Sequence, residues 1–348
     1  MSFRNFDELE ISTQTVIADS NMMMDIEEFF HKIPIDDVKS GGDGEIIPAV
    51  DCCHALQRPP PGKAKPKRSK QNIFLPSEMS PEDVHVTEMI AEPAYQMNRL
   101  SEDAMWIRLL PSVRCRAMYF KNEIKIHPSM NFQARERYFR NALNVVLSIG
   151  NKMVNFKLSK NGKFQLTGCK YLWHAQVCVV AFFQRIREWC PERVSPCVRI
   201  SFQTVMTNVD FNIGHTIDRA RLDEKINAET TYYSLLETSF GYTGVNIKFP
   251  IPPDWWKIMK VPVVSICSGE KESIVCDDLI FDCTLQDTDR QRFRVKQKYN
   301  TFLVFHSGNV IMSGMSPQLM KADYDIFTDF LTQWSKDIRE RIRKRSDE

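Results

Sequence analysis

The stretch that decides the fold is FLVFHSGNVIMSG, which runs from Phe302 to Gly314. Apolar residues flank a Ser-Gly pair, which predicts two antiparallel strands joined by a tight turn. Successive side chains of a strand point to opposite faces of a sheet. A three-residue turn therefore divides the hairpin into one face with Phe302, Val304, Val310 and Met312, and another with Leu303, Phe305, Ile311 and Ser313. Both faces are largely apolar, so helices can cover only one of them, and the other must meet a second layer, a partner or a ligand.

A second hairpin of the same kind lies earlier in the chain. NFKLSKNGKFQLTG, from Asn155 to Gly168, alternates around Asn161-Gly162, which is a strong hairpin signal. Each hairpin ends in Thr-Gly or Ser-Gly. Each then leads into an apolar-striped segment that predicts a long helix, at about 173–189 and about 317–343.

The beginnings of the two halves also match. ISTQTV starts at Ile11 and ISFQTV starts at Ile200, and each predicted strand leads to a helix with an Asp or Thr cap. Strand, helix, variable middle, hairpin and long helix thus occur twice, which predicts a duplicated unit. We place the first repeat at 1–190, with a mobile insertion rich in Gly, Pro and Lys at about 39–81, and the second at 191–348, with an insertion at about 250–300.

The composition describes an ordinary globular protein. Hydrophobic residues make up 43% and charged residues 26% of the chain, and a net charge of +2 leaves any basic surface local. The ten cysteines follow no disulfide framework, the polar start MSFRNFDELE is not a secretory signal, and no apolar run is long enough to span a bilayer. We therefore expect an intracellular protein that is not secreted, keeps its cysteines reduced and has no membrane partner.

No motif for catalysis or metal binding stands out. The cysteine pairs Cys190/Cys197 and Cys276/Cys283 are too widely spaced for a zinc knuckle and have no His at ligand spacing, and CCH, from Cys52 to His54, lies in the first insertion. The sequence has no phosphate loop, nucleophile elbow or zinc-protease helix. We expect no enzymatic activity, no cofactor, no metal and no small-molecule substrate.

VFHSGNVIMSG followed by a long helix resembles the TATA-binding-protein family, whose repeats carry an Ile-Phe-x-Ser-Gly-Lys-x-Val-x-Thr-Gly hairpin. QTV in the first strand of each half resembles that family's Gln-Asn-x-Val strand. The similarity covers about half of the chain. Its divergence and insertions resemble a remote relative such as a protein of a large DNA virus, located in the nucleus, a viral factory or the virion. The resemblance implies an α+β fold, a saddle in which two pseudo-symmetric repeats form one curved antiparallel sheet with helices on the convex face.

The function that this resemblance implies is DNA binding in the minor groove. The concave face would bend AT-rich promoter DNA, and the protein would recruit general transcription factors or RNA polymerase subunits for transcription initiation. Minor-groove edges distinguish little beyond A·T from G·C, so small hydrogen-bonding groups and apolar contacts suit them better than arginine forks. Aromatic or aliphatic wedges then enter a base step and kink the duplex.

The resemblance also assigns DNA-contacting residues on the central strands and in the second half. Gln14 and Gln203 stand at the family's central Asn pair, and the apolar contacts that follow are Val16 and Val205. In the second hairpin, the intercalating Phe, its neighbour, and the family's Val and Thr correspond to Phe305, Leu303, Ile311 and Ser313. The family's other Phe would be Phe240 or Tyr242, with Lys248 near the phosphates.

In the first half the same resemblance gives a different set. A two-residue Asn-Gly turn would pair Leu158 with Gln165, and Phe156 with Thr167. Leu158 would then occupy the wedge position and Phe156 the position beside it. Lys163 matches the family's Lys after the turn Gly, whereas Gln165 replaces the family's Val.

Other interpretations of these residues stay open. Leu303 and Phe305 could be core residues of a sheet that is buried on both faces, and Gln14 and Gln203 could be structural amides. KAKPKRSK, from Lys63 to Lys70, fits a nuclear import signal, a phosphate-binding arm or a solvated linker.

The rival function is a saddle kept as a protein-interaction or virion-packaged scaffold that has lost DNA binding. The near-neutral net charge favours it. So do Gln165 and Asn309, because each replaces a residue that the family uses against DNA.

Overall fold

The computed structural model describes residues 3–36, 47–48, 112–130, 141–237, 244–255, 259–267, 274–279 and 297–340. The predicted insertion at about 39–81 lies outside these residues apart from 47–48, and the predicted site residues Phe240 and Tyr242 lie outside them as well.

The first half contains the strands β1 (Ile11–Ser20), β2 (Ile47–Pro48), β3 (Val113–Phe120), β4 (Glu123–Ile126), β5 (Ala142–Ile149), β6 (Lys152–Ser159) and β7 (Lys163–Cys169). Its helices are α1 (Ile26–Lys32) and α4 (Leu172–Trp189), with short 3-10 turns at Phe6–Glu8 and Pro191–Arg193. Asp25 caps α1 by accepting a hydrogen bond from the backbone N–H of Glu28 at 3.2 Å, as its sequence predicts.

The second half contains β8 (Cys197–Asn212), β9 (Tyr233–Glu237), β10 (Gly244–Pro250), β11 (Lys260–Cys267), β12 (Ile274–Leu279), β13 (Tyr299–Phe305) and β14 (Asn309–Gly314). Its helices are α5 (Arg219–Glu229), α9 (Pro317–Gln333) and α10 (Ser335–Ile338). The cap of α5 is Asp218, two residues after the Thr that the sequence suggested.

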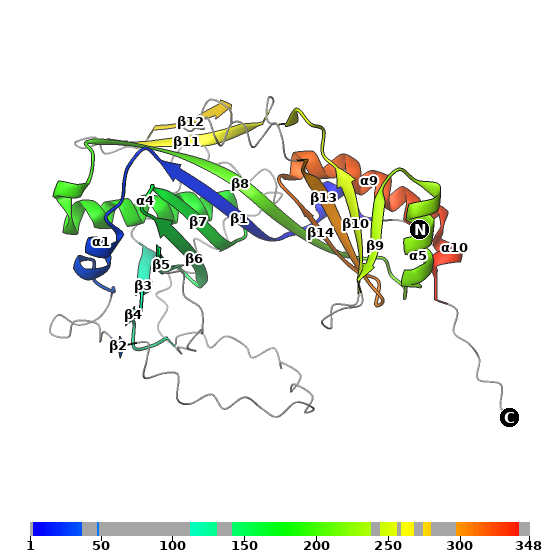
Figure 1. Ribbon diagram of the computed structural model, residues 1–348, viewed down its shortest axis with the longest axis horizontal. Coiled ribbons are helices and arrows are strands. Elements are labelled where there is room, and N and C mark those ends of the chain that lie inside the picture. Colours follow the sequence, from blue (N-terminus) through cyan, green and yellow to red (C-terminus); the bar gives the residue numbers. More distant parts are fainter. Residues whose placement is uncertain are drawn as a thin grey trace.

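These strands form one 14-stranded antiparallel sheet in the order β2-β4-β3-β5-β6-β7-β1-β8-β14-β13-β10-β9. The long strands β1 and β8 pair at its centre, and in Figure 1 they connect the end with α4 to the end with α5, α9 and α10. The hairpin of β11 and β12 lies off this path, because β11 pairs with the first residues of β8. Outward from the centre, β7, β6, β5 and β3 on one side correspond in connectivity to β14, β13, β10 and β9 on the other. The predicted α+β class is confirmed.

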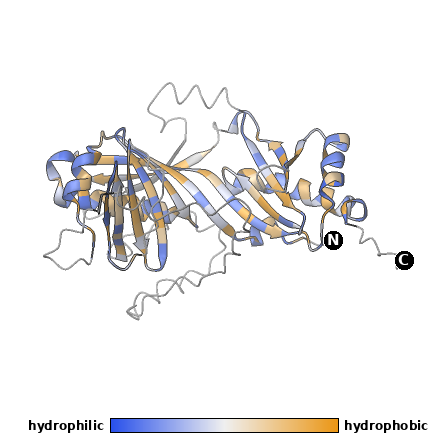
Figure 2. Cartoon of the chain, turned by 60° about the horizontal axis from the view of Figure 1, so that its bottom comes forward, coloured by the Kyte–Doolittle hydropathy of each residue, from blue (hydrophilic) through white to orange (hydrophobic). Residues whose placement is uncertain are grey.

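The helices cover one face of this sheet, and alternating residues account for it. Phe164 and Leu166 of β7 are buried, whereas Lys163, Gln165 and Thr167, which alternate with them, are not. The buried set packs against α4, and the equivalent residues of β13 and β14 pack against α9. Figure 2 shows this alternation of hydrophilic and hydrophobic residues along the strands. The period of two predicted from the sequence thus leaves one face of the sheet to the helices.

At the centre of the sheet, each hydrophobic core includes residues from the other half of the chain. Ile200 and Phe202 of β8 belong to the core beneath α4, and Phe6 and Ile11 belong to the core beneath α9. Because β1 and β8 run antiparallel over nearly their whole common length, the start of each strand reaches into the other half. The division into repeats at 1–190 and 191–348 stays a prediction, and each core needs residues from both sides of it.

Candidate nucleic-acid interface

The face opposite the helices, which we call the open face, runs from β6 across β7, β1, β8, β14, β13 and β10 to β9. In the first half it carries Met153, Asn155, Lys157, Lys163, Gln165 and Thr167; at the centre Thr13, Thr15, Ile17, Asp19, Gln203, Met206, Asn208 and Asp210; and in the second half Tyr233, Leu235, Asn246, Lys248, Tyr299, Leu303, Phe305, Ile311 and Ser313. All of these side chains are exposed or half-buried. Five of the seven most exposed large hydrophobic residues of the described chain lie here, namely Met153, Met206, Tyr233, Leu235 and Tyr299. Such a concentration of exposed apolar side chains is typical of an interaction surface.

The second hairpin has the register that its sequence predicts. Phe302 pairs with Met312, Leu303 pairs with Ile311, and the turn has three residues. Its Phe302 face is buried beneath α9. Its other face holds the predicted contact residues Leu303, Phe305, Ile311 and Ser313, which are half-buried and belong to the open face.

The first hairpin differs from its prediction by one position. Phe156 pairs with Leu166 and Leu158 pairs with Phe164, so the predicted pairing was wrong. The turn has three residues instead of two and ends in Gly162, whose φ of 78° is a left-handed conformation that glycine adopts readily. A Cβ on this glycine would lie 2.2 Å from the backbone oxygen of Met22, so the turn is also closely packed.

This register removes Phe156 and Leu158 from the candidate site. Their exposed fractions are 2% and 0%, and the ring centroid of Phe156 lies 5.2 Å from that of Phe182 on α4. They are core residues beneath the helix, and the predicted wedge role of Leu158 was wrong. The predicted residues Lys163, Gln165 and Thr167 do lie on the open face.

On the central strands, two of the predicted DNA-contacting residues face the helices instead of the open face. Gln14 is 1% exposed and Val16 is 0% exposed, because both face the helix-covered side of β1. A register irregularity between Ile11 and Thr13 puts Ile11 and Gln14 on the same face, which letter alternation alone does not reveal. Among the described residues, no hydrogen-bond partner meets either amide atom of Gln14.

Gln203 is on the open face, but it is not the counterpart of Gln14. Across β1 and β8, Gln203 pairs with Ile17, whereas Gln14 pairs with Thr207. Val205 is half-buried at a register irregularity, since its neighbours Thr204 and Met206 pair with consecutive residues of β1. The repeated six-letter string at Ile11 and Ile200 therefore does not mark equivalent positions.

Equivalent positions follow from pairing with the hairpins. Gln14 pairs with the last residue of β7 and Thr207 with the last residue of β14. Counting outward, Asn208 and Asp210 on β8 correspond to Thr15 and Ile17 on β1. Sequence reasoning missed these four open-face residues. Their equivalence follows from strand pairing, which the letters alone do not show, and the repeated string pointed to other positions.

The two ends of the open face differ in chemistry. In the first hairpin Lys157 pairs with Gln165 and Asn155 pairs with Thr167, which makes a polar surface. The second hairpin has Leu303 paired with Ile311 and adds Phe305 beside its turn. Hydrogen-bonding side chains therefore dominate one end and apolar side chains the other.

The charges on this face are mixed. The Lys163 Nζ lies 3.3 Å from a carboxylate oxygen of Asp19, which neutralises it in part. The Lys248 ammonium lies 5.9 Å and 6.0 Å from the ring centroids of Tyr233 and Tyr299, within range of a cation–π contact. Lys157 adds a cation on the first hairpin, and Asp210 adds an exposed carboxylate on β8.

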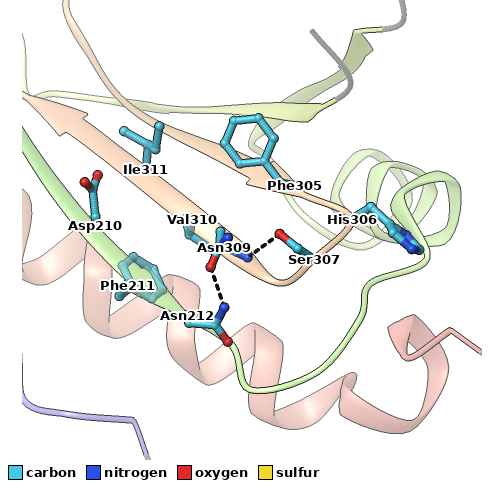
Figure 3. Close-up of a pocket in the computed structure, with 9 residues that line it drawn as sticks. All are labelled: Asp210, Phe211, Asn212, Phe305, His306, Ser307, Asn309, Val310 and Ile311. Carbon is cyan, nitrogen blue, oxygen red and sulfur yellow. Dashed lines mark hydrogen bonds between the residues drawn. The ribbon is translucent and has the colours of Figure 1, made fainter. Parts of the chain in front are cut away.

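A depression at the tip of the second hairpin brings several of these residues together. Figure 3 shows Phe305, Ile311 and Asp210 around it, with Asn212 of β8 donating to the Oδ1 of Asn309 at 2.5 Å. Gly308, in the turn of this hairpin, has a φ of 81°. The depression is open to solvent, so the aromatic side chain of Phe305 can be reached by a flat partner.

The described residues also bear on metal binding and membrane crossing. They contain no group of three or more His, Cys, Asp or Glu side chains that could hold a metal ion. No helix among them is both long and apolar enough to cross a membrane.

Comparison with known proteins gives few relatives. No family model matches the chain. A protein of Invertebrate iridescent virus 6, "Uncharacterized protein 335L", is 25% identical over 206 residues, which cover 57% of this chain and 61% of that protein. The chain thus matches less than two thirds of the length of this viral relative. Among solved structures, Methanococcus jannaschii TBP is similar with a TM-score of 0.31 and 13% sequence identity, over 57% of this chain and 82% of that one.

Proposed function

We propose that the open face binds double-stranded DNA in the minor groove and bends it with a wedge at one end. The observation that carries the proposal is the face itself, where hydrogen-bonding side chains line the centre and the half-buried Phe305 lies beside Leu303 and Ile311 at one hairpin. As the family resemblance implies, the preferred duplex would be AT-rich promoter DNA, and the helix-covered side would recruit transcription factors or polymerase subunits.

The centre of the face suits the edges of minor-groove bases. Thr15, Gln203 and Asn208 offer hydroxyl and amide groups, which can donate hydrogen bonds to the acceptors that A·T pairs present in that groove. Short side chains on a sheet can approach the groove floor closely. This arrangement reads groove shape and A·T content more than sequence.

The second hairpin supplies the bending element. Phe305 projects from the end of β13 beside the turn, and Leu303 and Ile311 adjoin it on paired strands. An apolar wedge of this kind unstacks one base step and kinks the duplex, at a cost of a few kcal/mol that wider contact offsets. The first hairpin has Asn155, Lys157 and Gln165 in the corresponding region, so we expect a kink at one end of the site and hydrogen bonds at the other.

Energy transfer between dyes on the two ends of an AT-rich duplex tests the proposal. Saturating protein should shorten the distance between the dyes. An unchanged distance would refute bending, and the absence of any electrophoretic shift at low salt would refute DNA binding.

A pair of lysine variants adds a control for the location of the interface. Lys248→Ala removes a cation from the open face, whereas Lys336→Ala removes one from α10. If phosphates approach Lys248, its loss should lower the slope of log affinity against log salt by about 0.9, and the α10 variant should not change it. Equal effects of the two variants would show that binding does not use the open face.

A second candidate function is a protein-interaction scaffold that has lost DNA binding. The carboxylate of Asp210 on the open face favours it, as does the ion pair of Lys163 with Asp19, because both weaken attraction to phosphates. The exposed Tyr233, Leu235 and Tyr299 would serve such an interface as well. Failure of the electrophoretic shift at low salt would leave this candidate in place of the first.

A further inference from the structure

Asp210 is the one residue of the hairpin depression whose chemistry does not match an A·T-reading surface. It lies on the open face of β8, directly opposite Ile311 of β14. Figure 3 shows its carboxylate on the same side of the strands as Phe305 and Ile311. Its side chain is exposed, and no hydrogen bond or ion pair joins it to the residues that the structure describes.

The other carboxylate at the centre of the open face is in a different situation. Asp19 lies 3.3 Å from the ammonium of Lys163, so an opposite charge already offsets it. The residue at the position of Asp210 in the first half is Ile17, which carries no charge. Among the described residues of the open face, an unpaired carboxylate thus lies at the end that carries the aromatic wedge and not at the end of the first hairpin.

The minor groove offers such an acceptor a single type of partner. A·T pairs present only acceptors there, at adenine N3 and thymine O2, and a G·C pair adds the N2 amino group of guanine as a donor. An ionised carboxylate can only accept. Against an A·T pair, Asp210 would face lone pairs as well as the phosphates, whereas against a G·C pair it can accept a hydrogen bond from the guanine amino group.

We infer that Asp210 makes the open face select a guanine next to the base step that Phe305 enters. The inference rests on the proposed function, since it names the base specificity of the same site. Ile311 lies between the two side chains in the depression, so the base pair that Asp210 meets adjoins the unstacked step. The preferred duplex is then AT-rich with one G·C pair near one end, and that pair sets the orientation in which the protein binds.

Base analogues test this selection one group at a time. A single G·C pair is moved through an AT-rich duplex to find the position of tightest binding. At that position it is replaced by inosine·C, which lacks only the N2 amino group, or by 2,6-diaminopurine·T, which adds that group to an A·T pair. We expect the G·C and diaminopurine·T duplexes to bind about tenfold more tightly than the inosine·C and A·T duplexes.

Two variants connect the preference to its residue. Asp210→Ala removes the acceptor altogether, so the preference for the N2 amino group should disappear. Asp19→Asn removes a charge from the same face without touching the depression, and the preference should remain. Thermal melting of both variants checks that they fold.

The outcomes separate the inference from the proposed function. If no duplex is shifted at low salt, the proposed function fails and the inference fails with it. If the duplexes bind but the N2 amino group has no effect, or if the preference survives in Asp210→Ala, the inference is overturned and the DNA-binding function stands. Loss of the preference in Asp210→Ala, together with its retention in Asp19→Asn, supports the inference.

Discussion

Two phenylalanines on β13 allow the fold and the proposed function to be perturbed separately. Phe302 is 0% exposed, and its ring centroid lies 4.2 Å from that of Phe327 and 5.0 Å from that of Phe249. Phe302→Ala removes a ring from a packed core and leaves a cavity, which should lower the free energy of unfolding by about 3–5 kcal/mol.

Phe305→Ala should change DNA bending more than it changes the stability of the fold. Full burial of a Phe side chain is worth about 1.5–3 kcal/mol, so truncation of the half-buried Phe305 should lower the free energy of unfolding by about 1 kcal/mol. In the DNA complex the variant loses the wedge but also avoids the cost of unstacking a base step. We therefore expect its bend angle to change much more than its affinity.

Urea denaturation followed by tryptophan fluorescence measures the first quantity, and energy transfer between duplex ends measures the second. Phe302→Ala should unfold at a much lower urea concentration but should bend DNA normally while it is folded. Phe305→Ala should unfold almost like the wild type and leave the duplex nearly straight. A loss of 3 kcal/mol or more for Phe305→Ala would show that its ring is a core residue, and normal bending by this variant would refute the wedge.

Three further predictions concern charge, pH and backbone conformation. Asp19→Asn removes the carboxylate beside Lys163, so DNA affinity should rise and the slope of log affinity against log salt should steepen by about 0.9. The free energy of unfolding should change by less than about 1 kcal/mol. An unchanged slope in titrations at several salt concentrations would place Lys163 away from the phosphates. Burial, with smaller contributions from Lys152 and Lys170, lowers the pKa of His174 from 6.5 to about 3. As the pH falls, His174 is therefore protonated in the unfolded chain before it is protonated in the folded protein, and the free energy of unfolding should fall by about 2 kcal/mol between pH 7.5 and 5. His174→Gln lacks this group, so its denaturation should show a smaller loss over the same range. An equal loss would contradict the assignment to His174. Gly308→Ala should lower the free energy of unfolding by about 3 kcal/mol and Gly150→Ala by about 1 kcal/mol. Both glycines have positive φ, but of the two only Gly308 would place a Cβ 2.2 Å from a backbone oxygen, that of His215. Equal melting temperatures of the two variants would refute the difference.

The hairpins show what local sequence can and cannot decide. In the second hairpin, strict alternation around Ser307-Gly308 gave the correct faces, since apolar side chains occupy both of them in register. In the first hairpin, Asn161-Gly162 suggests a two-residue turn, but the chain uses three residues. Close packing of the turn glycine against the loop after β1 accompanies that choice, and this tertiary contact cannot be seen in the hairpin's own letters.

The central strands show a second limit. Repeated letters at Ile11 and Ile200 suggested a register, but irregularities in the pairing of β1 and β8 shift the faces, and the true counterpart of Gln14 is Thr207. Such irregularities depend on how two strands fit each other along their length. The sequence therefore predicted the strands themselves, and the pairing decides which of their side chains reach the open face.

The contrast between the two faces of the sheet explains why the halves differ where they do. On the helix-covered face both hairpins keep apolar pairs, Phe156 with Leu166 in one and Phe302 with Met312 in the other, because each must fill the space beneath a long helix. On the open face the polar pair of the first hairpin corresponds to an apolar pair in the second, and no other layer of the described chain covers either of them. Packing among the described residues does not require this difference. Under the proposed function, a duplex held by hydrogen bonds at one end and by a wedge at the other would account for the difference.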